Sequence, residues 1–303
     1  MNAPLVSVPA RRLVTPATVV QFVLLTLIWG STWLVIKHQI VAVPIAWSVA
    51  YRFLVAGVAM LVYCLVMRRP LRLGASGHAF AGGAAVLQFV ANFNFVYQSE
   101  RFVTSGLVAL VFSLLIVPNT VLSRIFLGNP ISGRFVLGSV MGIAGLVMLV
   151  GPDLGLGGGT TALGLGLAVA GMLSASVANV MQASQRVRGM PLEAFLTTAL
   201  LYGGLLNAAF AFATAGTPTA SAQPSYVLGV LYLGLVASAL AFRLYYSLIR
   251  NIGPARAGYV NVIVPVVAMT LSTVFEAYVW TPLAVCGGVL ALAGLVIALR
   301  SRG

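Results

Sequence analysis

A small set of uncharged polar and aromatic side chains stands inside otherwise apolar stretches of this sequence. Gln88 and Asn92 are four residues apart, which places them on one face of a helix. Amide and hydroxyl groups at such positions can hold a zwitterionic solute. They can also bond between helices as packing contacts, worth on average about 0.6 kcal/mol each. For Gln88 and Asn92 we favour the binding interpretation.

Other candidates extend this pattern along the chain. Ser238, Phe242 and Tyr245 follow one another at helical spacing, with Tyr246 beside them. Trp29 offers a flat wall to an apolar or aromatic ligand. The predicted binding residues are Trp29, Gln88, Asn92, Ser113, Asn179, Ser238, Phe242, Tyr245 and Tyr246. For the aromatic members, plain core packing or lipid contact is the competing interpretation.

Groups that carry catalysis or bind metals are scarce. Each of the four acidic residues falls in a predicted loop or at a predicted helix end, and the two cysteines and two histidines do not form a ligand cluster. The sequence contains no H-E-x-x-H, nucleophile elbow or paired carboxylates. We therefore predict no catalytic residue, no metal site and no cofactor.

The composition indicates where these side chains lie. Hydrophobic residues make up 60% of the 303 positions, charged residues only 7%, and the mean hydropathy is +1.05. Soluble proteins have about 25% charged residues, so the whole chain is expected in a lipid bilayer. The net charge of +13 would suit a nucleic-acid partner. Basic residues placed between apolar segments argue against that.

Ten apolar runs, separated by Pro, Gly and Arg, predict ten transmembrane helices. They cover residues 18–36, 44–66, 79–97, 103–123, 135–150, 162–181, 192–212, 226–248, 257–274 and 282–299. The first run is long enough to span a membrane, so we expect a helix there and not a cleaved signal peptide. The fold class predicted is an all-α integral membrane protein.

The arginines and lysines predict the topology. With both termini in the cytoplasm, 13 of the 17 basic residues fall on the inner side, as the positive-inside rule requires. Residues 1–17 and 300–303 are then cytoplasmic tails. Trp33, Trp47, Tyr278 and Trp280 fall near the predicted outer boundary, where aromatic rings favour the headgroup level.

Two arginines lie within predicted helices. Arg52 is expected roughly 12 Å inside the outer boundary, where a charge is costly. It could pair with helix-end carbonyls or with Glu100, or it could capture a substrate carboxylate, and we favour the first. Arg243 is near enough to the inner end to extend its charge to the membrane surface.

The two halves of the chain resemble each other. GSVMGIAGLVML from Gly138 is similar to GGVLALAGLVIAL from Gly287, and Pro118 matches Pro265 at nearly the same offset. Residues 18–151 and 152–299 are thus predicted to form two five-helix repeats. Because five is an odd number, the second repeat enters the membrane from the opposite side and is inverted relative to the first. The glycine stripes predict close packing of the fifth and tenth helices. The two prolines are predicted to kink their helices. They are the candidate hinges, and a merely structural bend is the alternative.

These segments resemble the drug/metabolite transporter (DMT) superfamily and its EamA-like members. LIWGSTWLVIK, AYRFLVAG and IVPNTVLSRIFLGNPIS resemble the family's first repeat, and VIVPVVAMTLSTVFEAYVWTP its second. One departure is that Asn129 replaces the acid that Glu276 supplies in the second repeat. Overall similarity is to bacterial amino-acid exporters, the YddG type that handles aromatic amino acids among them.

The resemblance implies a multi-pass transporter of the bacterial inner membrane, a monomer or homodimer. It implies alternating access through a central cavity lined by helices one, three, four, six, eight and nine. The expected substrate is an amino acid; a sugar, nucleoside, purine or drug is the alternative, and a membrane-embedded enzyme or a channel is a more remote one. Because no carboxylate is predicted near the midplane, we expect facilitated diffusion without proton coupling.

Overall fold

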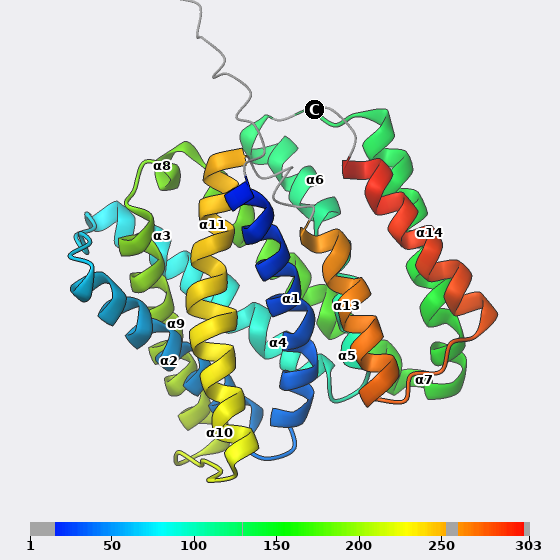
Figure 1. The fold of residues 1–303 in the computed structure, drawn as a ribbon, viewed down its shortest axis with the longest axis horizontal. Helices are drawn as coiled ribbons and strands as arrows, with labels where there is room; N and C mark the ends of the chain where they lie inside the picture. The colour runs from blue at the N-terminus through cyan, green and yellow to red at the C-terminus, as the bar shows by residue number, and fades with distance from the viewer. Residues whose placement is uncertain (1–15, 129, 253–259, 300–303) are drawn as a thin grey trace, which may run out of the picture.

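The computed structural model describes residues 16–128, 130–252 and 260–299, and these residues form helices without a strand (Figure 1). The predicted tails, apart from residues 16 and 17, and Asn129 lie outside the described residues. The elements are α1 (Pro16–Gln39), α2 (Ile45–Val66), α3 (Ala75–Ala84), η1 (Ala85–Ala91), α4 (Asn92–Ser99), α5 (Ser105–Ser113), α6 (Ile116–Leu127), α7 (Gly133–Ala183), α8 (Gln185–Arg188), α9 (Leu192–Ala215), α10 (Pro224–Leu231), η2 (Tyr232–Leu240), α11 (Ala241–Ile252), α13 (Val260–Phe275) and α14 (Pro282–Leu299).

Seven helical stretches of the described chain are long and apolar enough to cross a membrane. These are Thr18–Gln39, Ile45–Val66, Ala75–Ser99, Ser105–Leu127, Gly159–Ala183, Leu192–Ala215 and Pro224–Leu248. Three apolar helices are shorter, namely Gly133–Leu149, Ile263–Phe275 and Pro282–Ala298. Large apolar side chains stand exposed along them, for example Val140 (60%) and Leu205 (61%). Such a surface suits lipid and not water, so the chain is an all-helical membrane protein.

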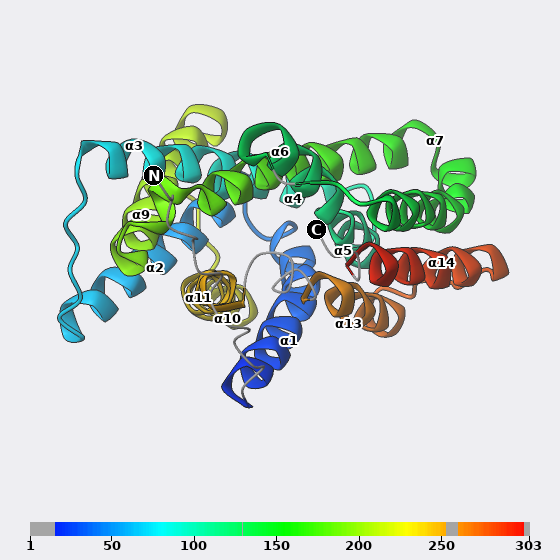
Figure 2. The same cartoon turned by 90° about the horizontal axis from the view of Figure 1, so that it is seen from above.

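The predicted helices at 135–150 and 162–181 correspond to the apolar stretches Gly133–Leu149 and Gly159–Ala183, but the helical backbone is not interrupted between them. The structure has one continuous helical element, α7, from Gly133 to Ala183. Its 51 residues would be about 77 Å long if straight, more than twice the thickness of a hydrocarbon core. Figure 2 shows instead that α7 turns back on itself at its far end, so its two parts lie alongside each other.

The two predicted hinge prolines differ in their effect on the helix. The predicted helix 103–123 is broken at Leu114 and Leu115, between α5 and α6. Leu114 is four residues before Pro118, where a proline ring clashes with the carbonyl and no amide is present to bond it. Pro265, by contrast, lies inside α13 without ending it. Only the first proline therefore coincides with a break.

Two π-helical segments occupy related positions in the halves. η1 spans Ala85–Ala91 and η2 spans Tyr232–Leu240, an offset of 232 − 85 = 147 residues at the start and 240 − 91 = 149 at the end. A π-helix widens the turn and upsets the regular hydrogen-bond pattern. Side chains from partner helices bond to its carbonyls: Ser174 to Leu87 O at 2.7 Å, and Asn207 to Phe89 O at 2.9 Å. Both bonds are in η1. They satisfy backbone carbonyls that the hydrocarbon of a bilayer could not bond.

Small residues allow α7 and α14 to pack at backbone contact, as predicted for the fifth and tenth helices. A Cβ added to Gly145 would lie 2.5 Å from Gly287 O, and one added to Gly294 would lie 2.6 Å from Gly138 O. The glycine prediction is therefore confirmed. In the same way, α2 packs against α9, where a Cβ on Gly204 would lie 2.8 Å from the amide of Leu54.

The first residue of α1 and the last residue of α14 lie at the same end of the molecule (Figure 1). The opposite end carries the ends of α1 and α4 and the beginnings of α2 and α5. We refer to this opposite end, with Lys37, Glu100, Ser105 and Glu276, as the distal end.

Candidate functional site

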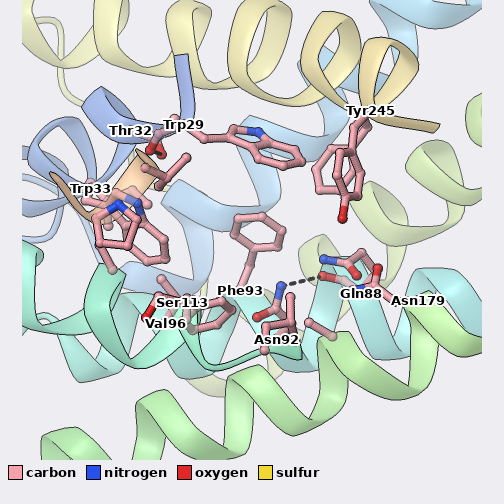
Figure 3. A pocket seen from close by; sticks show the side chains of 18 of the residues that line it. Trp29, Thr32, Trp33, Gln88, Asn92, Phe93, Val96, Ser113, Asn179 and Tyr245 are labelled. Carbon is pink, nitrogen blue, oxygen red and sulfur yellow. Dashed lines mark hydrogen bonds between the residues drawn. The ribbon is translucent and has the colours of Figure 1, made fainter. Parts of the chain in front are cut away.

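A cavity lies between α1, α2, η1, α4, α5, α7, α11 and α13 (Figure 3). It has a volume of about 100 Å³. At roughly 10–15 Å³ for each water-sized body, it accommodates a small solute on the order of ten non-hydrogen atoms. The elements predicted to line it do so, and α2 joins them through Arg52.

Most of the predicted binding residues meet in this cavity. Its lining includes Trp29, Gln88, Asn92, Ser113, Asn179, Phe242 and Tyr245, together with the predicted hinge Pro265. Ser238 and Tyr246 do not line it. Ser238 instead accepts a hydrogen bond from Arg52 Nε at 2.9 Å, and Tyr246 packs behind Phe242 with ring centroids 5.8 Å apart. Ser238 therefore contacts the lining residue Arg52, and Tyr246 contacts the lining residue Phe242.

One wall of the cavity is aromatic. The Trp29 ring meets Tyr245 edge-on at 4.8 Å and Phe242 at 5.7 Å between centroids. The indole Nε1 donates to Ala237 O in η2 at 3.3 Å, which fixes the ring against the second half of the chain. This wall can bury the apolar side chain of a solute.

Three amide side chains lie on the opposite side, from Gln88, Asn92 and Asn179 (Figure 3). Asn92 Nδ2 donates to the backbone oxygen of Gln88 at 3.3 Å. The oxygens Gln88 Oε1 and Asn92 Oδ1 are buried and accept no hydrogen bond from the described residues. Unsatisfied buried acceptors cost about 1–3 kcal/mol each, and both oxygens belong to residues that line the cavity.

Arg52 departs from the partners we expected. It is 2% exposed and lines the cavity. It bonds neither helix-end carbonyls nor the Glu100 carboxylate among the described residues. Nε donates to Ser238 as above, and Nη1 donates to Tyr97 Oη at 3.5 Å. Its Cζ lies 4.4 Å from the Phe93 ring centroid.

Arg243 also has a specific partner. Its Nη2 lies 3.5 Å from Glu193 Oε1, and its guanidinium covers the Tyr63 ring at 4.9 Å. Glu193 lies in the first turn of α9, so the Arg243 side chain reaches a helix end and pairs there.

Several residues that line the cavity were not predicted from the sequence. Trp33, expected at the headgroup level, lines the cavity with its ring 5.3 Å from Phe112. Trp47 is also buried, 5.6 Å from Tyr51. Phe93 and Val96 line the cavity from α4, next to Asn92. Val96 is four residues after Asn92, and this helical spacing could have indicated it.

Two polar links join neighbouring segments at the distal end. Lys37 Nζ donates to the backbone oxygens of Glu100 and of Val103, the latter at 3.0 Å. The Glu276 carboxylate accepts from the Ser105 amide at 3.1 Å and from its hydroxyl at 2.6 Å. Ser105 begins α5, and a helix N-terminus stabilises an anion. Glu276 thus acts here as a tie between α13 and α5.

Glu100 follows the apolar span directly and is fully buried (0% exposed). Its two carboxylate oxygens accept no hydrogen bond in the described structure. Burial raises the pKa of Glu100 well above its usual value of 4.5; Lys37 and Arg52 oppose this shift, and Glu276 adds to it. Tyr97 is a further titratable side chain that interacts electrostatically with Glu100. Glu100 therefore retains its proton to a higher pH than an exposed glutamate.

This predicts a pH-dependent stability for Glu100→Gln. A carboxyl with a raised folded pKa stabilises the fold fully below its unfolded pKa, and this contribution is lost as pH rises through the folded pKa. The wild type should therefore lose stability relative to Glu100→Gln above about pH 4.5, by at most about 1.4 kcal/mol per pH unit. Thermal unfolding in detergent from pH 4 to 8 measures this difference. A constant difference across that range contradicts the expectation.

A second, larger hollow of about 520 Å³ lies between α13 and α14. Its polar groups are already engaged: Thr270 Oγ1 donates to Val266 O, Thr273 Oγ1 donates to Met269 O, and Trp280 Nε1 donates to Thr273 Oγ1 at 2.8 Å. An apolar groove of this kind lacks the polar groups that orient a metabolite. In the described part of the chain, no three His, Cys, Asp or Glu side chains gather as metal ligands.

Comparisons with known proteins support one family. The EamA-like transporter family matches residues 17–151 and again residues 162–300. An inner membrane transporter of Escherichia coli K12, YedA, is 31% identical over 257 residues, which are 82% of this chain and 79% of that protein. A Salmonella typhimurium protein named as a probable amino-acid metabolite efflux pump is 24% identical over 90% of this chain and 92% of its own length. A crystal structure at 21% identity has the same fold, with a TM-score of 0.70 over 93% of this chain and 96% of the other.

Proposed function

The chain belongs to the EamA-like transporter family of the DMT superfamily, and from this premise we propose that it carries amino acids across the membrane by facilitated diffusion. It is a multi-pass transporter of the bacterial inner membrane. Neutral amino acids, aromatic ones included, are the proposed substrates. The cavity between the two halves is the proposed site.

The observation that carries the proposal is the pairing of two chemically different walls. Gln88 and Asn92 present unsatisfied acceptor oxygens, which suit an ammonium group. Trp29 and Tyr245 present an aromatic wall, which suits an apolar side chain. An α-amino acid contains both features within a few bonds. The name of the Salmonella relative, a probable amino-acid metabolite efflux pump, points to the same substrate class.

We further propose ten spans arranged as two inverted repeats with both termini in the cytoplasm. Three shorter apolar helices added to seven long ones give ten. The related offsets of η1 and η2, and the common end at which α1 begins and α14 ends, agree with that arrangement. Alternating access would open the distal end by releasing the links of Lys37 and Glu276, with Pro118 and Pro265 as hinges.

Ligand-dependent stability tests the proposed function directly. A solute that binds the folded state raises its apparent stability, by about 2.7 kcal/mol at a hundred times its Kd. We expect amino acids to raise the unfolding temperature of the purified protein and to compete for uptake of labelled tryptophan into proteoliposomes. Stabilisation and competition by sugars, nucleosides or purines alone would assign the carrier to another metabolite class.

A further inference from the structure

Arg52 is a buried cation without an acidic partner in the described structure. The one ion pair among the described residues joins Arg243 and Glu193, and Arg52 takes no part in it. Its guanidinium is held by neutral groups, Ser238, Tyr97 and the Phe93 ring. These contacts orient the charge but do not neutralise it. A charge inside a membrane protein is costly unless it is paired.

Neither acid of the distal end forms an ion pair with Arg52 in the described structure. Glu276 is already bound by the amide and hydroxyl of Ser105. Glu100 does not come within 4.0 Å of the Arg52 nitrogens, and its raised pKa favours the neutral acid. Lys37 bonds the backbone oxygen of Glu100 and is a second cation at that end. Neither Glu100 nor Glu276 is therefore an ion-pair partner of Arg52 among the described residues.

The guanidinium retains capacity for a ligand. Arginine carries five N–H donors in a planar fork that fits a carboxylate. The described hydrogen bonds of Arg52 come from Nε and Nη1, and Nη2 makes none. Ser238 and Tyr97 thus hold the fork at the cavity wall with one amino group still free to donate.

We propose that Arg52 binds the carboxylate of the transported solute and restricts the carrier to substrates that have one. This inference rests on the proposed function and names the substrate class of the same cavity. The ammonium group of the solute then donates hydrogen bonds to the amide oxygens of Gln88 and Asn92, and the side chain of the solute packs against Trp29. A solute with an amide or a hydrogen in place of its carboxylate loses the charge-assisted bond.

The experiment compares L-leucine, L-leucinamide and 3-methylbutylamine, which share a side chain and differ in the carboxyl group. Each is used to compete with labelled L-leucine for uptake into proteoliposomes. For the wild type we expect leucine to compete at least tenfold better than the other two. Arg52→Gln should abolish the preference, and Arg52→Lys should retain part of it. Equal competition by the three compounds in the wild type, or an unchanged preference in Arg52→Gln, overturns the proposal.

Two readouts keep the test decisive. If Arg52→Gln does not fold, thermal stabilisation of the wild type by leucine but not by leucinamide still supports the proposal, and equal stabilisation overturns it. Leucinamide transported as well as leucine would refute the role of Arg52 alone. No uptake or stabilisation by amino acids of any side chain would refute the proposed function, and the role of Arg52 with it.

Discussion

Gly145→Ala is expected to destabilise the protein strongly, although it adds a single methyl group. The new Cβ would lie 2.5 Å from Gly287 O and 2.8 Å from Ala291 Cα on α14. Both obstacles are on the helix backbone, so the helices must separate. Overpacking of this kind costs about 1–3 kcal/mol, and a leucine at the same position should prevent folding. Thermal unfolding and gel filtration in detergent measure both effects.

Gly166→Ala is the matched control, because Gly166 lies on the same element, α7, and nothing stands within 4 Å of its added Cβ. Alanine is a better helix former than glycine, so this variant should be at least as stable as the wild type. Equal behaviour of the two variants would show that the contact of α7 with α14 is not the close backbone packing described above.

Removal of the two cavity amides should have the largest effect on transport. Gln88→Ala and Asn92→Ala each remove a buried acceptor from a residue that lines the proposed site. A hydrogen bond to a charged group is worth about 1.5–3 kcal/mol, so each variant should lower uptake at limiting amino acid by about tenfold or more. Their thermal stability should change little, because these oxygens have no protein partner to lose.

Gln98→Ala provides the comparison for this pair. Gln98 belongs to α4, does not line the cavity and bonds Arg101. Its loss should leave uptake unchanged. Normal uptake in both Gln88→Ala and Asn92→Ala, measured in proteoliposomes at equal protein content, would remove these residues from the binding site.

The sequence predicts the cavity well where helical spacing alone determines the face. The four-residue spacing of Gln88 and Asn92 predicts their common face, and both residues line the cavity. Trp29, predicted as a flat wall for an apolar ligand, lines it too. Phe93 was missed, although it follows Asn92 directly on α4 and also lines the cavity. Arg52 was interpreted as a structural charge, because only the fold reveals that its expected partner, Glu100, is out of reach.

The helix boundaries show a similar limit. Apolar runs locate the spans, but they do not show whether the backbone continues between two of them. A turn was expected between the fifth and sixth spans, and α7 does turn back on itself, but its backbone stays helical throughout. A single helix was expected at 103–123, yet it breaks at Leu114. Proline chemistry explains the second case, and glycine-rich sequence gave no comparable signal for the first.

The π-helical segments make the cavity sensitive to insertions and deletions. One residue fewer within Ala85–Ala91 would allow a regular α-helix to form, and each residue turns an α-helix by about 100°. A π-helix spreads about the same rotation over one more residue, so the flanking helices would largely keep their directions and the change would fall on the segment itself, which contains Gln88. A one-residue deletion in η1 would therefore alter the binding surface locally, without replacing any residue on the flanking helices.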